Sequence, residues 1–279
     1  MKKIAALTMV RNAEFFLGKW TAYYGAALGR ENLYIFFDGE DQTVPECASG
    51  CHTKVLPRAG GNVQASDRRR IDILSAFAAE LFKEYDLVIG TDVDEFVAVD
   101  PSLGVSLPEF LSGLNIDGRD SFSCLGCDVI HNIRKEPALD QAAPLLSQRH
   151  YARLSTRYSK ASVLCRPVAW GSGFHRIRKG NFHIVPGLYL FHFGCADASF
   201  LGLKLDDGDL SARGWNHHLY KRRRMMKCLP YLPVCNWDRW TRRAQWLQNR
   251  IRHIYAFNKP AMLGLRIVVR IPERFSSLV

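Results

Sequence analysis

Residues 86–96 read DLVIGTDVDEF, an apolar run that ends in a cluster of carboxylates. A run of this length predicts a buried strand. Alternate side chains of an extended segment point the same way, so Asp92 and Asp94 are expected to share a face. Neighbouring carboxylates repel each other unless a cation lies between them, and Mg²⁺ or Mn²⁺ suits such oxygen ligands. The alternative is a solvated acidic turn, because a DxD pattern is common by chance.

Apolar runs and helical patterns alternate before this segment. Residues 3–10, 32–37 and 53–56 have the length of buried strands. Aromatic residues recur at helical spacing over residues 16–27, and a second helix is predicted over 66–81 with Ser66 as its N-cap. This order predicts an α/β fold with a mostly parallel, Rossmann-like sheet and flanking helices. Such sheets bind ligands beyond the carboxyl ends of their strands.

The later part of the chain differs in charge. A helix near 107–114 and strands around 121–130, 161–166 and 187–193 are predicted. Residues 201–279 then contain 16 Lys or Arg and 5 Asp or Glu, whereas residues 1–200 are neutral, so the whole net charge of +11 lies at the C-terminal end. We therefore divide the chain into a domain at 1–205 and a basic, partly amphipathic helical extension at 206–279.

An apolar stripe within an arginine-rich stretch predicts an amphipathic helix from Trp240 onward. The stripe consists of Trp240, Ala244, Leu247, Ile251 and Ile254. Two interpretations remain open. Region 236–279 lies at an anionic membrane surface, or the helix packs on the body with its arginines in water.

Composition excludes several classes of protein. The chain has 279 residues, of which 47% are hydrophobic and 23% charged, so it is neither disordered nor a disulfide miniprotein. No stretch reaches the roughly 18 apolar residues of a membrane-spanning helix. The eight cysteines are expected to be reduced thiols, and we expect a cytoplasmic protein, peripheral at the inner face of the cell membrane. The neutral body argues against a nucleic-acid partner.

Several polar residues follow the predicted strands or begin the second helix. Asp38 ends a strand, where a carboxylate can accept hydrogen bonds from a nucleobase or ribose, although Asp-Gly is also a common turn pair. Arg69 and Arg70 fall in the predicted first helical turn, where cations oppose the helix dipole. A bound phosphate, assisted by Gln64, would offset that cost. The alternative is solvated arginines neutralised by nearby aspartates.

Two histidines lie in aromatic and glycine-rich surroundings, His175 and His192. Each is expected to be a core histidine by default. His192 ends a strand-like run, where an imidazole could complete a metal site begun by two aspartates.

Four motifs together resemble glycosyltransferase family 2, in particular its bacterial branch with a DVDEF metal motif. They are ALTMVRN at 6–12, an aromatic helix with Trp20 and Tyr23-Tyr24, Asp38-Gly39, and DVDEF at 92–96. The resemblance is good over residues 3–100, looser to about 205, where Phe191-His192-Phe193 is similar to a later His segment, and absent beyond. The chain departs from the family's motif at one point. The motif usually has Glu directly after Asn, whereas here Ala13 stands between Asn12 and Glu14.

This resemblance implies a GT-A fold and a metal-dependent hexosyltransferase that uses a nucleotide-sugar donor and acts on a glycan or lipid-linked acceptor in bacterial surface polysaccharide synthesis. It implies that Asp92, Asp94 and His192 hold Mn²⁺ or Mg²⁺. Donor contacts are expected from Arg11, Asn12, Asp38, Gln64, Arg69, Arg70 and Asp92. Inverting members need a carboxylate base, for which Asp197 and Asp128 are candidates by position.

Two other functions remain open. A nucleotidyl- or phosphotransferase could use the same aspartate pair and would release pyrophosphate. A non-catalytic protein could bind nucleic acid or an anionic surface through its basic tail. No P-loop or GxGxxG fingerprint is present, which fits a donor held by metal and side chains.

Overall fold

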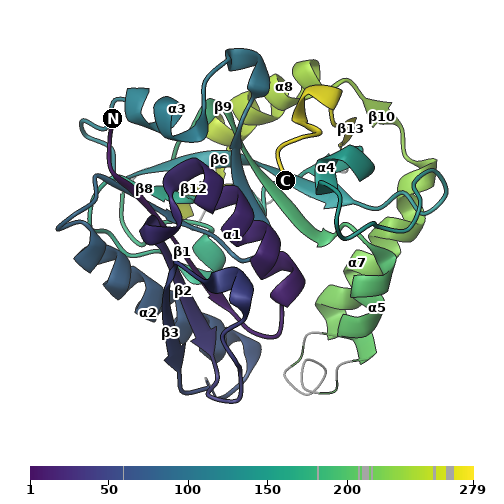
Figure 1. Ribbon diagram of the computed structural model, residues 1–279. Helices are drawn as coiled ribbons and strands as arrows, with labels where there is room; N and C mark the ends of the chain where they lie inside the picture. Colours follow the sequence, from purple (N-terminus) through teal and green to yellow (C-terminus); the bar gives the residue numbers. More distant parts are fainter. Residues whose placement is uncertain are drawn as a thin grey trace.

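The computed structural model describes residues 1–58, 60–180, 182–206, 208, 214, 216–253, 256–261 and 267–279 (Figure 1). The strands are β1 (Ile4–Val10), β2 (Leu33–Asp38), β3 (His52–Leu56), β4 (Leu87–Gly90), β5 (Glu95–Val99), β6 (Ser121–Ile130), β7 (Tyr151–Leu154), β8 (Val163–Leu164), β9 (Ile184–Cys195), β10 (Val234–Cys235), β11 (Arg252–His253), β12 (Ala256–Pro260) and β13 (Val268–Arg270). The helices are α1 (Glu14–Leu28), α2 (Val63–Leu81), α3 (Leu107–Gly113), α4 (Leu145–Gln148), α5 (Ala198–Asp206), α7 (Asn216–Cys228) and α8 (Trp237–Arg250).

The central sheet has the order β10-β13-β7-β6-β8-β4-β1-β2-β3. Its N-terminal part, β3-β2-β1-β4, is parallel throughout, and α1 and α2 provide the crossovers that parallel strands require. The predicted α/β class with a parallel sheet and flanking helices is confirmed. Beyond β4 the direction changes, because β8 pairs antiparallel with β4 and with β6.

Strand β1 separates two hydrophobic clusters. Ala6 and Val10 point into a cluster with Trp20 of α1, whereas Leu7 points into a second cluster with Leu74 of α2. This is the two-sided burial expected for a parallel strand covered by helices on both faces. The uninterrupted apolar run at residues 4–10 follows from it, since every side chain of β1 is buried.

The second half of the sheet is built around β6, which is buried along its whole length. It pairs with β7 and β8 in the antiparallel direction and with β9 in the parallel direction, and β9 also carries β5. Gly126 of β6 allows a very close approach, because a Cβ there would lie 2.3–2.5 Å from backbone atoms of Ser155, Tyr158 and Ser159. The segment that carries Tyr158 and Lys160 is thereby pressed against the sheet.

Helix α2 begins earlier than predicted. Its N-cap is Asn62, whose side chain accepts a hydrogen bond from the Ala65 backbone N–H at 3.0 Å. Ser66 lies inside the helix, so its prediction as N-cap is wrong. Arg69 and Arg70 consequently lie in the second turn, where the helix dipole no longer acts strongly on them.

The basic C-terminal part of the chain contributes to the core and the sheet. Strands β10 and β13 extend the central sheet, and β13 pairs with β7. In α8, Trp237 and Ala244 belong to the main hydrophobic cluster, so the apolar side of this helix faces the body. The helix ends at Arg250, before Ile251, and Ile254 lies outside the described residues.

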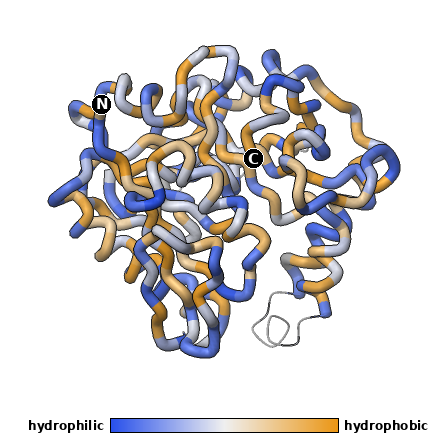
Figure 2. Tube along the Cα trace, viewed as in Figure 1, coloured by the Kyte–Doolittle hydropathy of each residue, from blue (hydrophilic) through white to orange (hydrophobic). Residues whose placement is uncertain are grey.

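All eight cysteines are free thiols, as expected. Within the described part of the chain, no helix combines the length and apolar character needed to cross a bilayer. Hydrophilic segments run along the outer loops of the trace (Figure 2).

Candidate active site

A cavity of about 1160 Å³ opens at the carboxyl ends of β1, β2 and β4. The residues that directly follow these strands line it, as the position of ligand sites in parallel sheets predicts. Its opposite wall comes from β6 and β9, from the segment at 153–160 and from helices α5, α7 and α8. The cavity therefore lies between the two halves of the molecule.

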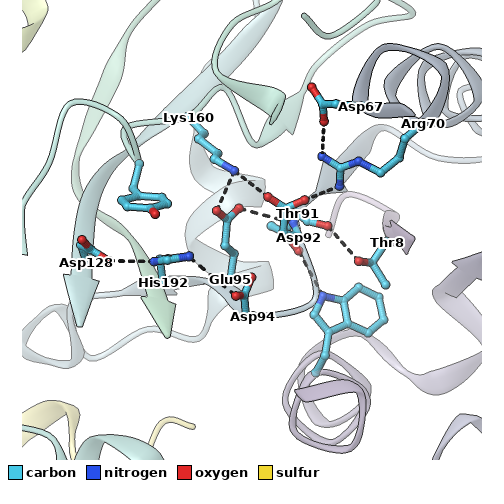
Figure 3. A network of polar contacts seen from close by, with 12 residues as sticks. Thr8, Asp67, Arg70, Thr91, Asp92, Asp94, Glu95, Asp128, Lys160 and His192 are labelled. Carbon is cyan, nitrogen blue, oxygen red and sulfur yellow. Dashed lines mark hydrogen bonds and ion pairs between the residues drawn. The ribbon is translucent and has the colours of Figure 1, made fainter. Parts of the chain in front are cut away.

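Two buried hydrogen bonds fix the backbone where β4 enters the acidic segment. The Thr8 hydroxyl donates to the Thr91 carbonyl oxygen at 2.9 Å (Figure 3). The Trp20 indole N–H donates to the Thr91 hydroxyl at 3.1 Å. Both Thr8 and Thr91 are fully buried. Such satisfied buried polar groups hold a segment in one conformation.

The acidic segment is a turn, which corrects the expectation of extended backbone. The Glu95 N–H donates to the Asp92 carbonyl oxygen at 3.0 Å, and β5 begins at Glu95. As a result, Asp92 and Asp94 do not share a set of partners. Their side chains lie on two sides of the segment (Figure 3).

Asp92 is neutralised by two cations of the chain itself. Its Oδ1 accepts a hydrogen bond from Arg70, which also pairs with Asp67 at 2.8 Å, and its Oδ2 lies 2.8 Å from Lys160 Nζ. Burial alone would raise the pKa of Asp92, but Arg70 and Lys160 outweigh burial and lower it well below its usual range. Asp92 is thus a charged group with both oxygens engaged.

Lys160 joins Asp92 to a third carboxylate. Its Nζ lies 2.6 Å from Glu95 Oε1, and both side chains are almost completely buried. Burial and the nearby charges of Asp92 and Asp94 raise the pKa of Glu95 to about 8, although Lys160 acts in the opposite direction. One buried ammonium therefore serves two carboxylates and holds this side of the site together.

Asp94 faces a histidine that is held from behind. His192 Nε2 lies 3.7 Å from Asp94 Oδ2, and His192 Nδ1 lies 2.8 Å from Asp128 Oδ1 (Figure 3). Tyr158 stacks on the imidazole with ring centroids 3.8 Å apart, and Arg153 binds the other oxygen of Asp128 at 2.8 Å. The ring is therefore fixed in position and tilt, with Nε2 directed toward Asp94.

An imidazole held in this way can coordinate a cation through Nε2 or accept a proton there. A carboxylate behind a metal-binding histidine is a common arrangement, because it fixes the ring and increases its basicity. Asp128 has both oxygens engaged, and hydrogen bonding from His192 overcomes burial to lower its pKa. This geometry places Asp128 as a support of His192.

Arg222 was missed from the sequence, where it is only one member of a basic run. Its Nη2 lies 3.5 Å from His192 Nε2 and 3.4 Å from the Tyr158 hydroxyl. Gly194 permits this approach, since a Cβ there would lie 2.6 Å from the His192 ring and 2.9 Å from Arg222. Among the described residues no carboxylate lies within ion-pair distance of Arg222, although burial is outweighed by groups that include Asp94 and Asp128, which raise its pKa. An anion in the cavity could therefore contact its guanidinium directly.

Lys160 was missed as well. It stands in a stretch at 156–160 without apolar periodicity or a motif. One signal for Arg222 is its helical spacing relative to apolar residues. It lies three residues after the buried Leu219 and four before the buried Met226. Basic residues at such core-facing spacing are unusual and need a partner.

The predicted donor-binding residues lie around this cavity. Its lining includes Arg11, Asn12, Asp38, Gln64, Arg69 and Arg70. Arg11 is tied to Asp41 at 2.7 Å and to the Asp38 carbonyl oxygen at 2.7 Å, so it shapes the loop after β2. Arg69 is exposed at the edge, whereas Arg70 is turned toward Asp92.

Asp197 is not brought to the cavity. Its Oδ2 pairs with the buried Arg149 at 2.8 Å, and its Oδ1 accepts hydrogen bonds from the N–H and hydroxyl of Ser199 at the start of α5. These contacts stabilise the corner between β9 and α5. His175 lines the cavity just after the short 3₁₀ turn at Ser172–Phe174, and burial lowers its pKa to about 3, so it is a neutral ring.

The described residues contain no group of three or more His, Cys, Asp or Glu arranged to hold a metal ion. A divalent cation fits best between Asp94 and His192, because their 3.7 Å separation allows both to contact one ion, which would take its other ligands from phosphate and water. Asp92 fits less well, since Arg70 and Lys160 occupy both of its oxygens.

No protein-family model and no curated protein matches the chain. Among solved structures, it is similar to a mannose-1-phosphate geranyltransferase from Thermus thermophilus, with 11% identity, a TM-score of 0.29 and coverage of 98% of this chain and 76% of the other.

Two further structures match 44% of the chain at 14% identity. They are a cytidylyltransferase from Leptospira borgpetersenii, with a TM-score of 0.26 and 54% of its length covered, and the bifunctional glycosyltransferase WbbM, with a TM-score of 0.27 and 23% covered. Likeness at this level carries no argument about activity, which has to come from the site itself.

Proposed function

We propose that the protein is a glycosyltransferase that binds a nucleotide-sugar donor in this cavity and transfers the sugar to an acceptor hydroxyl. One observation carries the proposal: Asp94 and the supported imidazole of His192 face each other in a large cavity, beside a guanidinium, Arg222, that has no carboxylate partner among the described residues. A diphosphate needs such a set of groups. The resemblance of residues 3–100 to glycosyltransferase family 2 supports the same conclusion.

In this proposal Asp94 and His192 hold Mn²⁺ or Mg²⁺. When bound, the cation would neutralise charge on the leaving nucleoside diphosphate. Arg222 would bind the same diphosphate by charge-assisted hydrogen bonds, which are strongest in a site shielded from water. Asp128 and Tyr158 keep His192 in place, and Arg70 and Lys160 keep Asp92 ionised and fixed.

The nucleoside would lie at the carboxyl ends of β1 and β2, where Asn12, Asp38 and Gln64 line the cavity. The acceptor would enter from the opposite wall. That wall combines apolar side chains with cations, among them Leu219, Lys221, Met225 and Leu247. It suits a glycan or a lipid-linked acceptor. We also propose that the transfer inverts the configuration of the anomeric carbon. The product would serve surface polysaccharide synthesis at the cytoplasmic face of a membrane.

Donor turnover tests this function. Purified protein is incubated with UDP-, GDP- and CMP-sugars and Mn²⁺, and release of the nucleotide is followed by chromatography. We expect release from one donor class, loss of release in Asp94→Asn, and retention in the control variant Asp117→Asn, which changes an exposed carboxylate outside the cavity. Absence of turnover and of metal-dependent nucleotide binding with every donor would contradict the proposal.

The charge of the cavity favours a second candidate, a nucleotidyl- or phosphotransferase. Among the described residues, the lining contains eleven Lys or Arg and six Asp or Glu. Such an excess suits a nucleoside triphosphate together with a phosphorylated acceptor. The products separate the two candidates, because a nucleotidyltransferase releases pyrophosphate and a glycosyltransferase releases a nucleoside diphosphate or monophosphate.

A further inference from the structure

Helix α7 has three sides with different surroundings. One side is buried in a hydrophobic cluster with β6 and β13, through Leu219 and Met226. A second side lines the cavity, through Lys221, Arg222 and Met225. The third side faces outward and exposes Tyr220, Arg223, Arg224 and Lys227, which follow one another at helical spacing.

The outward side of α7 is continued by the turn that follows the helix. Tyr231 is 68% exposed, Tyr220 is 59% exposed, and the guanidinium of Arg134 lies over the Tyr231 ring, 4.5 Å from its centroid. Residues 216–234 contain five Lys or Arg and no Asp or Glu. The face thus consists of clustered cations with a tyrosine at each end, and its segment of the trace carries hydrophilic stretches (Figure 2).

We propose that this face, formed by Tyr220, Arg223, Arg224, Lys227 and Tyr231, binds the surface of an anionic lipid bilayer. Lysine and arginine side chains are attracted to acidic headgroups, and each adds to the attraction within a Debye length of the surface. Tyrosine is suited to the headgroup region, because its ring enters the apolar boundary while its hydroxyl stays hydrated.

The exposed apolar side chains nearby favour a bilayer over nucleic acid. Leu203 of the neighbouring α5 is 70% exposed, and Val234 after the turn is 45% exposed. Such side chains gain from contact with a lipid boundary and have nothing to gain from a phosphate backbone.

This surface replaces α8 as the membrane-facing element, since the apolar side of α8 is buried in the core. It also connects to the cavity, because α7 carries the docking face on one side and Arg222 on the other. A protein docked in this way would hold its acceptor wall next to the membrane. The inference stands without the proposed reaction, because binding to lipid does not require catalysis.

Vesicle co-sedimentation with the full-length protein tests the proposal. The probes are vesicles of phosphatidylcholine alone and of phosphatidylcholine with phosphatidylglycerol, at low and at physiological salt. We expect binding only to the anionic vesicles, weaker at higher salt. The triple variant Arg223→Gln/Arg224→Gln/Lys227→Gln should bind at least about tenfold more weakly.

A matched variant controls for the loss of charge. Arg239→Gln/Arg242→Gln/Arg243→Gln removes three exposed cations from α8 and should bind within about twofold of wild type. Tyr220→Ser/Tyr231→Ser should weaken vesicle binding while leaving circular dichroism unchanged. Equal loss in both triple variants, equal binding to neutral vesicles, or tighter binding to a short single-stranded RNA or DNA than to anionic vesicles would overturn the proposal.

Discussion

The two aspartates of residues 92–94 lie only two positions apart, yet they differ in how cations reach them. The pKa of each is lowered despite burial, that of Asp92 by cations in contact with it and that of Asp94 by His192, Lys204 and Arg222 from a greater distance. Asp92 is enclosed by an arginine and a lysine, each at hydrogen-bond distance. Asp94 has no cation at that distance among the described residues, and its nearest partner is an imidazole 3.7 Å away. The turn between them separates a carboxylate with both oxygens bound to cations from one whose oxygens have no cation in contact among the described residues.

This difference shows that a DxD pattern need not work as a symmetric pair. Asp92 contributes by organising the donor side, where it anchors Arg70 of α2 and Lys160 of the segment before β8. Asp94 can still take part in ligand binding. The comparison leads to four predictions, which follow in order of decreasing size.

Lys160→Met tests the cations that surround Asp92. Removing the ammonium takes one of its two cations from Asp92 and raises the pKa of Glu95 above its value of about 8, so Glu95 takes up a proton on folding. Breaking a buried ion pair in this way costs about 3–5 kcal/mol. We expect a fall of that size in the free energy of unfolding, measured by urea denaturation at pH 8. The double variant Lys160→Met/Glu95→Gln should recover part of it, because the neutral amide does not have to take up a proton when the protein folds. An unchanged stability in the single variant would contradict the buried ion pair.

Asp94→Asn tests the aspartate that has no cation at hydrogen-bond distance among the described residues. The amide keeps the shape of the side chain but removes its charge, so metal-dependent stabilisation of the leaving group is lost. We expect kcat/KM for donor turnover to fall on the order of 100-fold or more, with little change in thermal unfolding. A variant that retains most of its activity would show that Asp94 is not part of the catalytic machinery.

Asp128→Asn tests the carboxylate that holds His192 in place opposite Asp94. The imidazole of His192 would lose its charge-assisted hydrogen bond and its fixed orientation. Loss of such a supporting partner reduces metal affinity or activity by about 10- to 100-fold. Mn²⁺ titration of donor turnover measures the effect, and Arg153→Gln, which leaves the His192 contact in place, should change it less. Equal effects of the two variants would refute the supporting role.

Asp100 and Arg274 form a carboxylate–arginine pair outside the cavity and give the smallest effect. Burial would raise the pKa of Asp100, but hydrogen bonds from Arg274 and Ser102 lower it below its ordinary value. The pair therefore stabilises the fold above about pH 4, and this contribution is lost as the pH falls through the lowered pKa.

Water screens this pair because Arg274 is partly exposed, so we expect about 1 kcal/mol or less. Unfolding of wild type and Asp100→Asn at several pH values from neutral to strongly acidic measures the difference. It should shrink as the pH falls below about 4. A difference that does not change over this range would contradict a stabilising ionised pair.

The parallel part of the sheet, which carries the acidic segment, could be predicted from the sequence. Strands β1, β2 and β4 are buried on both faces, so their apolar runs at 4–10, 33–37 and 87–90 are readable without knowledge of the rest of the fold. The ligand-facing position of the segment after β4 follows from the sheet itself. Helix α2 was predicted with the wrong cap because Ser66 and Asn62 are both good N-cap residues.

The other half of the site depends on contacts between distant segments. Lys160 reaches Asp92 over 68 residues, and Arg222 reaches His192 over 30. The strands in this half of the sheet pair in both parallel and antiparallel directions. The close approach of these distant segments depends on single glycines such as Gly126 and Gly194. No local periodicity encodes such pairings, which is why Lys160 and Arg222 were missed and Asp197 was placed at the site.

Calorimetry with UDP, GDP and CMP, with and without Mn²⁺, separates the roles of the two aspartates when it is carried out on wild type, Asp94→Asn and Asp92→Asn. We predict that one nucleotide binds wild type in a Mn²⁺-dependent manner, that Asp94→Asn loses this dependence, and that Asp92→Asn binds more weakly but still responds to Mn²⁺. Loss of the Mn²⁺ response in Asp92→Asn together with its retention in Asp94→Asn would contradict the assignment of the metal site.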